Sequence, residues 1–319
     1  ALFPNPAPLA KLHGWSRKKP ASNQQQSTHM NRVVFGATVA VAFLIGLLIR
    51  EVASAPVGIL PDGGEFRGPM QQGRLQGTGE IRWRDGRFYQ GEFDNGLYHG
   101  RGLMTFAEGS RYEGQFVRGN MEGQGTLKYR NGDLYGGQFK QGSMHGHGRF
   151  VRDGNIYEGD FSADEFTGQG SLTMDGRLQY SGGFRDWNFH GEGQFFGEGG
   201  ESWKGTFVDG ELHGKGEYSD GNGNRYVGSF EHWQYHGQGI FYSSDNSRYE
   251  GEFSHSLFNG SGVMHLAQPE HGVLSYRGQW KNGTLVSADV PAFVVATAEK
   301  LEQALYSEAQ RLEQQLTTL

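Results

Sequence analysis

The sequence predicts a mainly β protein: an elongated single-layer antiparallel sheet of repeated β-hairpins, with one transmembrane helix before it and one amphipathic helix after it. Three observations lead to this prediction. Glycine accounts for 53 of the 319 residues, well above the roughly 7% that is usual. An aromatic residue followed by x-Gly recurs about every 23 residues. A charge-free apolar run precedes this region, and a glycine-free stretch rich in Glu, Gln, Ala and Leu follows it.

The aromatic residue before x-Gly marks each repeat. Successive occurrences are 23 residues apart in seven of the nine steps, with one step of 22 and a last step of 27. Such a fixed period is typical of repeat architectures, in which each repeat is one supersecondary unit. The ten residues at this position are Phe66, Tyr89, Tyr112, Tyr135, Tyr157, Tyr180, Trp203, Tyr226, Tyr249 and Tyr276.

Each repeat is predicted to form two short antiparallel strands. Its bulky residues are two or four positions apart, so they share one face of a strand. A further glycine, such as Gly96 or Gly119, marks a turn inside the repeat. The glycines of G-x-G leave one face bare, so that bulky side chains of the neighbouring repeat can lie over them. Pairs that favour the primed turns of hairpins separate the runs at Asp85-Gly86, Glu108-Gly109, Asn131-Gly132, Asp153-Gly154 and Asp175-Gly176.

The repeat resembles a known family. Its pattern, Y-x-G-x-F followed by Gly and then G-x-G, is the signature of MORN repeats, the membrane occupation and recognition nexus modules. The stretch from Tyr112 to Phe116, followed by Gly119, Gly123 and Gly125, is a close match. The resemblance covers residues 65–285, about 70% of the chain. It implies a twisted antiparallel sheet and a role in scaffolding, dimerisation, or attachment to membranes and partners, and it brings no catalytic residue.

Val33–Ile49 is predicted to cross a membrane as a helix. It has 17 residues without a charge and lies between Arg32 and Arg50. A helix of this length reaches roughly 25 Å, the short end of what crosses a bilayer. The alternative is a cleaved signal peptide, because residues 53–55 (Ala-Ser-Ala) resemble a cleavage site. Pro56 directly after that site, and the charged residues between the site and the apolar run, favour a retained helix.

The distribution of charge predicts the orientation of this helix. Residues 1–32 carry five basic residues and no acidic one, whereas residues 62–286 carry 29 acidic and 21 basic residues. The positive-inside rule keeps the basic tail on the cytoplasmic, matrix or stromal side and puts the repeats on the opposite side. A start at Ala1 fits a removed initiator or a cleaved transit peptide, so an organellar membrane (mitochondrial or thylakoid) or a bacterial inner membrane is expected. Nucleic acid is not expected as a partner of the acidic repeats.

The segment 287–319 is predicted to form an amphipathic helix. Apolar residues recur there at steps of three and four and make one stripe on a helix: Val294, Ala298, Leu301, Leu305, Ala309, Leu312 and Leu316. The helix either folds back on the open end of the sheet or pairs with a partner chain, a second copy included. An interfacial membrane helix is less favoured because its polar face has more acid than base. The remaining segments are a basic tail (1–32), the membrane helix (33–50), a linker (51–64) and the repeat array (65–286).

Interruptions of the repeat mark candidate partner-binding residues. Trp187 and Trp233 stand where other repeats have a turn glycine, and residues 160–167 and 254–259 also lack that glycine. Neutral drift in turns is one interpretation. The other is a docking edge, since exposed tryptophans are typical anchors at interfaces. The candidate residues are Trp187, Phe189, Trp233, Tyr235 and Phe258 in the repeats and Leu301, Leu305 and Leu312 in the terminal helix.

The sequence does not predict an enzyme. It has no cysteine, which excludes disulfides, thiolate metal sites and cysteine nucleophiles, and it has no phosphate-binding loop, G-x-S-x-G or H-E-x-x-H motif. Histidines precede the first glycine of G-x-G at one per repeat, and at a spacing of roughly 10 Å no two of them can share a zinc ion. These are His99, His145, His190, His213 and His236. No catalytic residue, cofactor or metal site is predicted.

The predicted function is a non-catalytic, membrane-anchored scaffold or accessory structural subunit of a larger membrane protein complex. Its repeats would mediate protein-protein contacts with other subunits, and Val33–Ile49 would contact the lipid bilayer. One alternative is a membrane- or lipid-tethering module, against which the acidic charge of the repeats counts, because anionic lipid attracts clusters of Lys and Arg. Another alternative is a glycan-binding array, which rests only on the aromatic residues.

Overall fold

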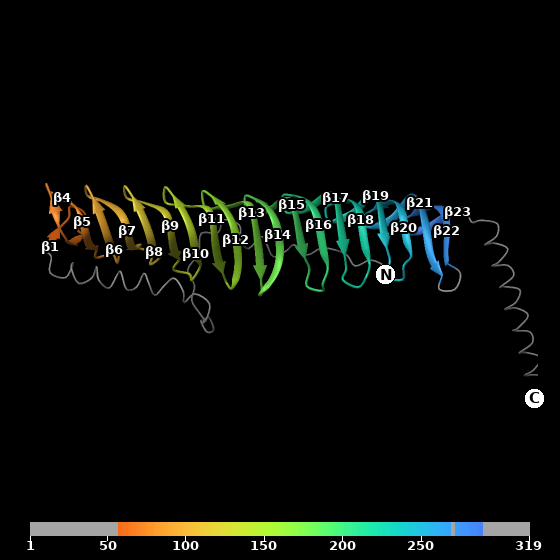
Figure 1. Ribbon diagram of the computed structural model, residues 1–319, viewed down its shortest axis with the longest axis horizontal. Helices are drawn as coiled ribbons and strands as arrows, with labels where there is room; N and C mark the ends of the chain where they lie inside the picture. The colour runs from red at the N-terminus through yellow and green to blue at the C-terminus, as the bar shows by residue number, and fades with distance from the viewer. Residues whose placement is uncertain (1–56, 269–271, 290–319) are drawn as a thin grey trace, which may run out of the picture. The chain divides into compact units, whose positions relative to one another are not determined.

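The computed structural model describes residues 57–268 and 272–289 (Figure 1). The chain divides at Gly193/Gln194 into two compact units, an N-terminal unit (57–193) and a C-terminal unit (from 194). Each unit consists of short antiparallel strands that follow one another in chain order as hairpins. The prediction of a mainly β protein built from antiparallel hairpins is therefore confirmed for the described residues.

In the N-terminal unit, β1 pairs with β2 and β2 with β5, and from β6 to β13 each strand pairs with its two neighbours in the sequence. β3 and β4 form a separate small hairpin. The strands are β1 (Val57–Ile59), β2 (Glu65–Arg67), β3 (Met70–Gln71), β4 (Arg74–Leu75), β5 (Gly77–Arg82), β6 (Phe88–Asp94), β7 (Leu97–Thr105), β8 (Arg111–Val117), β9 (Asn120–Lys128), β10 (Leu134–Lys140), β11 (Ser143–Arg152), β12 (Asn155–Ser162), β13 (Glu165–Met174) and β14 (Arg177–Arg185).

In the C-terminal unit, each strand from β17 to β22 pairs antiparallel with the strands before and after it. β15 (Asn188–Phe196) contains the unit boundary. The other strands are β16 (Ser202–Val208), β17 (Glu211–Ser219), β18 (Arg225–Glu231), β19 (Gln234–Tyr242), β20 (Arg248–Ser254), β21 (Leu257–Gln268), β22 (Gly272–Lys281) and β23 (Thr284–Asp289).

The ends of the predicted repeat array differ from those of the observed strands. β1 lies within the stretch predicted as a linker, and β23 ends at Asp289, beyond the predicted end of the array. The predicted transmembrane helix and the C-terminal helix with Leu301, Leu305 and Leu312 lie outside the described residues and stay predictions. Within 57–268 and 272–289, no helix is long and apolar enough to cross a membrane.

A bulge at G-x-G shapes the hairpin inside a repeat. Between β10 and β11, Gly137 lies opposite Gly148, but the next residue, Gln138, lies opposite His145, so that two residues of β11 have no partner on β10. The first of these, Gly146, has a φ of 57°, a left-handed conformation that favours glycine. The same shift of register occurs in hairpins of both units. The backbone therefore requires the first glycine of G-x-G.

The repeat tyrosine fills a slot above a pair of glycines on neighbouring strands. Tyr135 is fully buried, and a methyl group added to Gly137 or to Gly148 would lie 2.5 Å from its hydroxyl oxygen. The Tyr135 hydroxyl donates a hydrogen bond of 2.8 Å to the Gln138 carbonyl oxygen. The same slot recurs at Tyr89, Tyr112, Tyr157, Tyr180, Tyr226 and Tyr249. The expectation that a neighbouring repeat covers these glycines is wrong at these slots, because the ring comes from the same repeat. It holds at Gly216, where an added methyl group would lie 3.1 Å from the ring of Phe230 in the next repeat.

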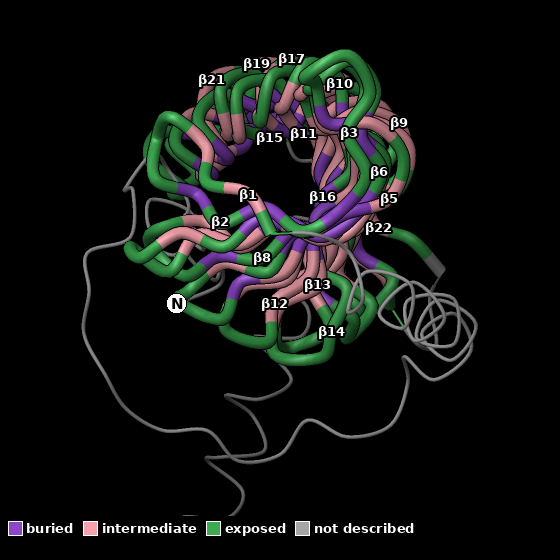
Figure 2. The backbone as a smooth tube through the Cα atoms, turned by 90° about the vertical axis from the view of Figure 1, so that its left-hand side faces the viewer, coloured by how far each residue is buried: buried purple, intermediate pink, exposed green. Residues whose placement is uncertain are grey.

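Aromatic contacts join each repeat to the next within a unit. Tyr112 packs edge to face on Phe116 of its own strand, with ring centroids 5.1 Å apart, and on Phe139 of the next repeat at 4.9 Å. Tyr157 and Phe166 stack face to face at 3.7 Å. Such pairs add about 0.5–1.5 kcal/mol each beyond the area they bury. Figure 2 shows the result, with buried residues along the strands and exposed residues at the turns.

The turns inside the repeats also bond to the preceding repeat. The N–H of the second turn residue donates to a backbone carbonyl there, as from Gly119 to Tyr98 at 2.9 Å and from Gly142 to Met121 at 3.0 Å. Arg118 and Gly119 both have positive φ, 50° and 88°, which is the geometry of a type I′ turn. Each turn therefore closes its own hairpin and fixes it against the hairpin before it.

The turns between repeats are of two kinds. Asp153-Gly154 and Asp175-Gly176 have positive φ at both residues, as predicted for primed turns. At the other three pairs only the glycine has positive φ, so the prediction of primed turns is wrong there. Those pairs lie in longer loops, closed by bonds such as that from the Tyr129 N–H to the Asp133 carbonyl oxygen at 2.8 Å. They are Asp85-Gly86, Glu108-Gly109 and Asn131-Gly132.

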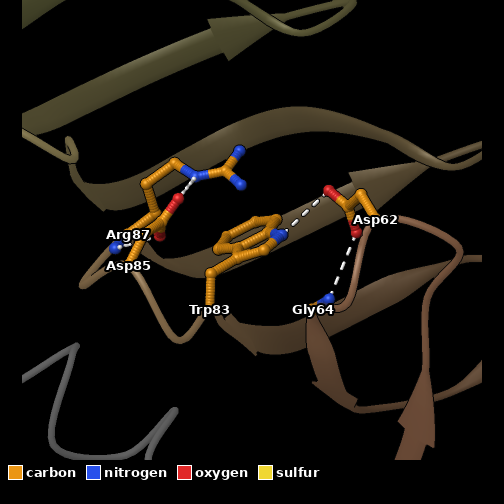
Figure 3. A network of polar contacts seen from close by, with 5 residues as sticks. All are labelled: Asp62, Gly64, Trp83, Asp85 and Arg87. Atoms are coloured by element: carbon orange, nitrogen blue, oxygen red, sulfur yellow. Dashed lines mark hydrogen bonds and ion pairs between the residues drawn. The ribbon is translucent and has the colours of Figure 1, made fainter.

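Polar contacts tie the first strands to the first repeat (Figure 3). The Asp62 carboxylate accepts hydrogen bonds from Trp83 Nε1 at 2.8 Å and from the Gly64 N–H at 3.2 Å. The bond from Trp83 lowers the pKa of Asp62. The Arg87 guanidinium lies over the Trp83 ring, 4.7 Å from its centroid, and Arg87 Nε donates to the Asp85 carboxylate at 2.7 Å. These contacts hold part of the predicted linker against the sheet.

Replacing Gly137 by alanine is expected to lower the free energy of unfolding by about 1–3 kcal/mol, because the added methyl group would overlap Tyr135 and the backbone at Gly148. Gly136 is the matched control: it precedes Gly137 on β10, and a methyl group there would meet no atom within 4 Å. Gly136→Ala should change stability by about 1 kcal/mol at most. Urea denaturation of the full chain, followed by circular dichroism, measures both. Equal midpoints for the two variants would contradict the slot.

Raising the pH is expected to unfold the protein between about pH 10 and 12. Burial raises the pKa of Tyr129, Tyr218 and Tyr249 from 10.0 to about 12. The unfolded chain loses these protons near its unshifted pKa while the folded chain keeps them, so their contribution is complete below pH 10 and is lost as the pH rises. Tyrosinate absorbance should rise in the same step in which the β signal in circular dichroism disappears. Full ionisation of every tyrosine with the β signal retained would count against this core.

Candidate binding surface

The C-terminal unit has a second face opposite its aromatic core. On β18, Tyr226 and Phe230 are buried, whereas Val227 and Ser229, which point the other way, are half-buried. One row of side chains crosses six strands of this face in register: Glu217, Val227, Ile240, Glu250, Val263 and Arg277. Apolar and charged side chains of both signs thus stand side by side.

A shallow depression of about 780 Å³ lies on this face. Gly239, Gly251 and Gly262 form part of its lining, and they belong to the glycine pairs that the repeat tyrosines cover on the other face. The remaining lining combines apolar Val227, Ile240 and Val263 with charged Lys215, Glu250, Glu252 and Arg277 and with Gln238, Ser261 and Gln279. We call this depression the glycine-floored groove.

The corresponding row of the N-terminal unit is more polar. It reads Gln90, Leu103, Glu113, Thr126, Gly136 and Arg149 from strand to strand. Leu103 occupies the position of Ile240, as the third residue after the first glycine of G-x-G in each case. Of the three residues of this row that are equivalent to Ile240 and Val263, only Leu103 is apolar, and the position of Val227 carries Gln90, Glu113 and Gly136. Leu103 therefore provides an internal reference for the groove.

Trp233 lies in the core of the C-terminal unit. It is only 4% exposed and contacts the rings of Phe195, Trp203 and Phe207, with centroids 5.4, 6.0 and 5.4 Å away. Its indole N–H has no hydrogen-bond partner among the described residues, so packing holds it in place. The expectation that Trp233 is an exposed anchor is wrong. The backbone N–H of Trp233 donates a hydrogen bond to the Leu212 carbonyl oxygen of the preceding repeat. The side chain of Trp233 folds back over that repeat.

Trp187 has more surface than Trp233. It is half-buried, and its ring centroid lies 4.0 Å from that of Phe166. Both tryptophans occupy the second position of a type I′ turn, with φ of 71° at Trp187 and 67° at Trp233. A large side chain in this conformation costs about 1–2 kcal/mol, which the ring contacts offset. Trp187 stays a candidate for partner binding.

The other candidate residues of the repeats belong to the stacked aromatic pairs. Phe189 is fully buried and stacks on Tyr180 at 3.8 Å, and Tyr235, 4% exposed, stacks on Tyr226 at 3.9 Å. Phe258 stacks in the same way but is half-buried. Phe189 and Tyr235 therefore offer no surface to a partner in this structure. The structure brings none of these residues into the glycine-floored groove.

Three side chains that can hold a metal ion come together in the C-terminal unit. Glu211, His213 and His232 each place one ligand atom within 4.8 Å of the other two. The Glu211 carboxylate lies 2.5 Å from His232 Nδ1 and 3.6 Å from His213 Nε2. The hydrogen bond between Glu211 and His232 raises the pKa of His232 and lowers that of Glu211. His232 lies on the next hairpin turn, and no pattern in the sequence predicts its contact with His213, which the repeat pattern groups only with the histidines at its own position of other repeats.

The MORN repeat model matches residues 89–111, 112–134, 135–155, 157–175, 203–225, 226–248, 249–268 and 276–285, which together make up just over half of the chain. The chain belongs to the MORN repeat family. MORN repeats are non-enzymatic repeat modules that bind proteins or membranes. Residues 176–202, which have no match, still contain a MORN-type tyrosine slot, because Tyr180 covers Gly182 and Gly193.

Individual proteins add little to the MORN assignment. No curated protein matches the chain. Among solved structures, a streptogramin B lyase structure is similar over 72% of this chain and 84% of its own, with 12% sequence identity and a TM-score of 0.14. A TM-score this low carries no argument about fold or function.

Replacing Trp233 by alanine is expected to lower the free energy of unfolding by about 3–5 kcal/mol, because the large ring would leave a cavity in the core. Trp233→Phe should cost much less, since it keeps a ring and removes the unpaired N–H. Trp187→Ala should cost about 0.5–3 kcal/mol, because part of that ring is already exposed. Urea denaturation of the full chain measures all three. An unchanged midpoint for Trp233→Ala would show that this ring is not buried in solution.

Proposed function

We propose that this MORN repeat protein is a non-catalytic scaffold whose C-terminal unit binds a protein partner through the glycine-floored groove. The observation that carries the proposal is the composition of the groove. Val227, Ile240 and Val263 supply apolar contact area, and Lys215, Glu250, Glu252 and Arg277 supply both signs of charge. Mixed charges around an apolar centre are typical of protein interfaces, where complementary charge selects the partner and fixes its register.

The floor of the groove favours a partner that approaches the backbone closely. Gly239, Gly251 and Gly262 lie between the two rows of side chains that cross the strands, at positions that face the core, so the lining is low there. The strands there are paired on both sides, so their backbone groups are already hydrogen-bonded and a partner cannot add as a strand. Recognition would therefore use the side chains on both sides of the groove: valine, isoleucine and charged side chains of one row, and amides and charged side chains of the other.

The charge of the C-terminal unit favours protein over anionic lipid. Its described residues include 11 acidic and six basic side chains, a net charge of −5. Binding to anionic lipid is typical of clusters of about 4–8 basic residues, and the groove has two, Lys215 and Arg277, beside two glutamates. A lipid-tethering role for this face would have to overcome the repulsion between like charges.

We further propose that the scaffold is an accessory subunit of a membrane protein complex. The span Val33–Ile49 would anchor it, the basic tail would stay on the cytoplasmic, matrix or stromal side, and the repeats would face the opposite side. This part of the proposal rests on the sequence: the charge-free apolar run and the basic residues that precede it. In this arrangement the groove would lie on the side of the membrane opposite the basic tail, where it could meet the domains that other subunits expose on that side.

A photo-crosslinking amino acid at Gln238 of the full chain is expected to capture a protein in the native membrane. Gln124 of the N-terminal unit is the matched position, because both are exposed middle residues of G-x-G. Capture should be at least about tenfold weaker at Gln124, and Ile240→Asp should reduce capture at Gln238 by a similar factor, since about 1.4 kcal/mol of lost binding energy is tenfold.

Leu103→Asp is the matched control for Ile240→Asp and should leave capture at Gln238 unchanged. Mass spectrometry of the adducts separates the candidate partners. Adducts with lipid alone, or equal protein capture at Gln238 and Gln124, would contradict a protein-binding groove in the C-terminal unit.

A further inference from the structure

The cluster of Glu211, His213 and His232 joins two consecutive hairpins. Glu211 and His213 are two residues apart on β17, so they point to the same side of the strand. His232 is the first residue of the turn between β18 and β19. The rings of His213 and His232 lie 4.7 Å apart at 74° to each other. Their near-perpendicular arrangement lets a ring nitrogen of each reach the Glu211 carboxylate.

The register of the repeats, not a chance meeting of surface side chains, brings His213 to His232. The residue before G-x-G regularly faces the first turn residue 19 positions later. In the N-terminal unit the Gln76 side chain accepts a hydrogen bond from the Asn95 N–H at 3.0 Å, and the Glu122 side chain accepts one from the Gln141 N–H at 3.0 Å. His213 and His232 have the same spacing, and here both positions carry an imidazole.

Equivalent positions of other repeats carry fewer metal-ligating groups. In chain order within the units, the three positions read Leu97-His99-Arg118, Asn120-Glu122-Gln141, Ser143-His145-Ala163, Glu165-Thr167-Asp186, Glu211-His213-His232 and Gln234-His236-His255. Two imidazoles with a carboxylate occur once in this series. The following repeat has both histidines but an amide, Gln234, in place of the Glu211 carboxylate.

We propose that Glu211, His213 and His232 bind a divalent transition-metal ion such as Zn²⁺. Two imidazoles and one carboxylate are a ligand set that suits zinc, with three protein ligands and a fourth position for water. At bond lengths of about 2.0–2.2 Å, tetrahedral ligand atoms are about 3.3 Å apart. The Glu211 and His213 atoms, at 3.6 Å, are close to this separation, and those of Glu211 and His232 have to move apart from 2.5 Å.

The side chains have the freedom that this adjustment needs. The Glu211 side chain is 45% exposed and that of His232 65% exposed, so rotation about their side-chain bonds can open the separation while the strands stay in place. Glu211 lies on β17, and His232 lies in the turn that follows the neighbouring strand, β18. The backbone at both residues is held in place by the hydrogen bonds that pair β17 with β18 and β18 with β19. The bound ion would therefore bridge two repeats and leave one coordination position open to solvent.

The experiment is titration of the chelator-stripped full chain with Zn²⁺ alone by isothermal calorimetry, at a pH where the histidines are neutral. In the wild-type chain, the site of Glu211, His213 and His232 should bind one zinc ion more tightly than the other histidines of the chain bind zinc. Glu211→Gln and His232→Ala should each weaken this binding by at least about tenfold, as expected for the loss of a direct ligand. His255→Ala is the matched control, because His255 occupies the equivalent turn position of the next repeat, and it should leave the affinity unchanged.

Gln234→Glu provides a gain of function. It completes the same set of three with His236 and His255, and a second zinc ion per chain is expected. Circular dichroism of each variant without zinc shows whether it is folded before its affinity is interpreted. The proposal is overturned if wild type shows no saturable zinc binding, or if His232→Ala and His255→Ala weaken it equally. A Gln234→Glu chain that binds no second ion would overturn the claim that the register of the repeats is enough to build the site.

Discussion

The repeat tyrosine above its pair of glycines is the contact on which the rest of the structure depends. In the slot of Tyr135, one glycine precedes the bulge on β10 and the other closes G-x-G on β11. The ring therefore packs against two strands at once, and its hydroxyl donates to a carbonyl oxygen beside the bulge. Burial raises the pKa of the Tyr135 hydroxyl, because the charged form would lose its contact with water. Any side chain at either glycine would displace the ring.

The glycines of the slots also line the opposite face. A side chain at Gly239, Gly251 or Gly262 would point toward the repeat tyrosines, because side chains alternate between the two faces of a strand, and the far side of the sheet is therefore low along that line. The shape of the glycine-floored groove thus follows from this alternation. Its chemistry is set independently, by residues such as Val227 and Ile240 that point away from the core and are free to differ from repeat to repeat.

The turns inside the repeats are the other place where variation is possible. Glycine is replaced at the second turn position by Asp164, Trp187, Trp233 and Ser256, each with positive φ. All four N–H groups still donate to the preceding repeat. Asp164 and Ser256 add a side-chain bond to a backbone N–H of that repeat, at Met144 and Tyr235, and the two tryptophans add ring contacts. The cost of a left-handed conformation is offset each time by a new contact with the previous hairpin.

Sequence alone determined the repeat, its period and its β-hairpin architecture, because glycines and aromatics at fixed spacing leave few other ways to bury the rings. It also identified the MORN pattern. It could not tell that Trp233 is buried while Trp187 keeps surface, because the direction of a turn side chain depends on whether the preceding repeat has room for it. Nor could it place His232 beside His213 and Glu211. That contact joins residues of different hairpins, and only the register of the folded sheet, with its two-residue bulge, decides which of them meet.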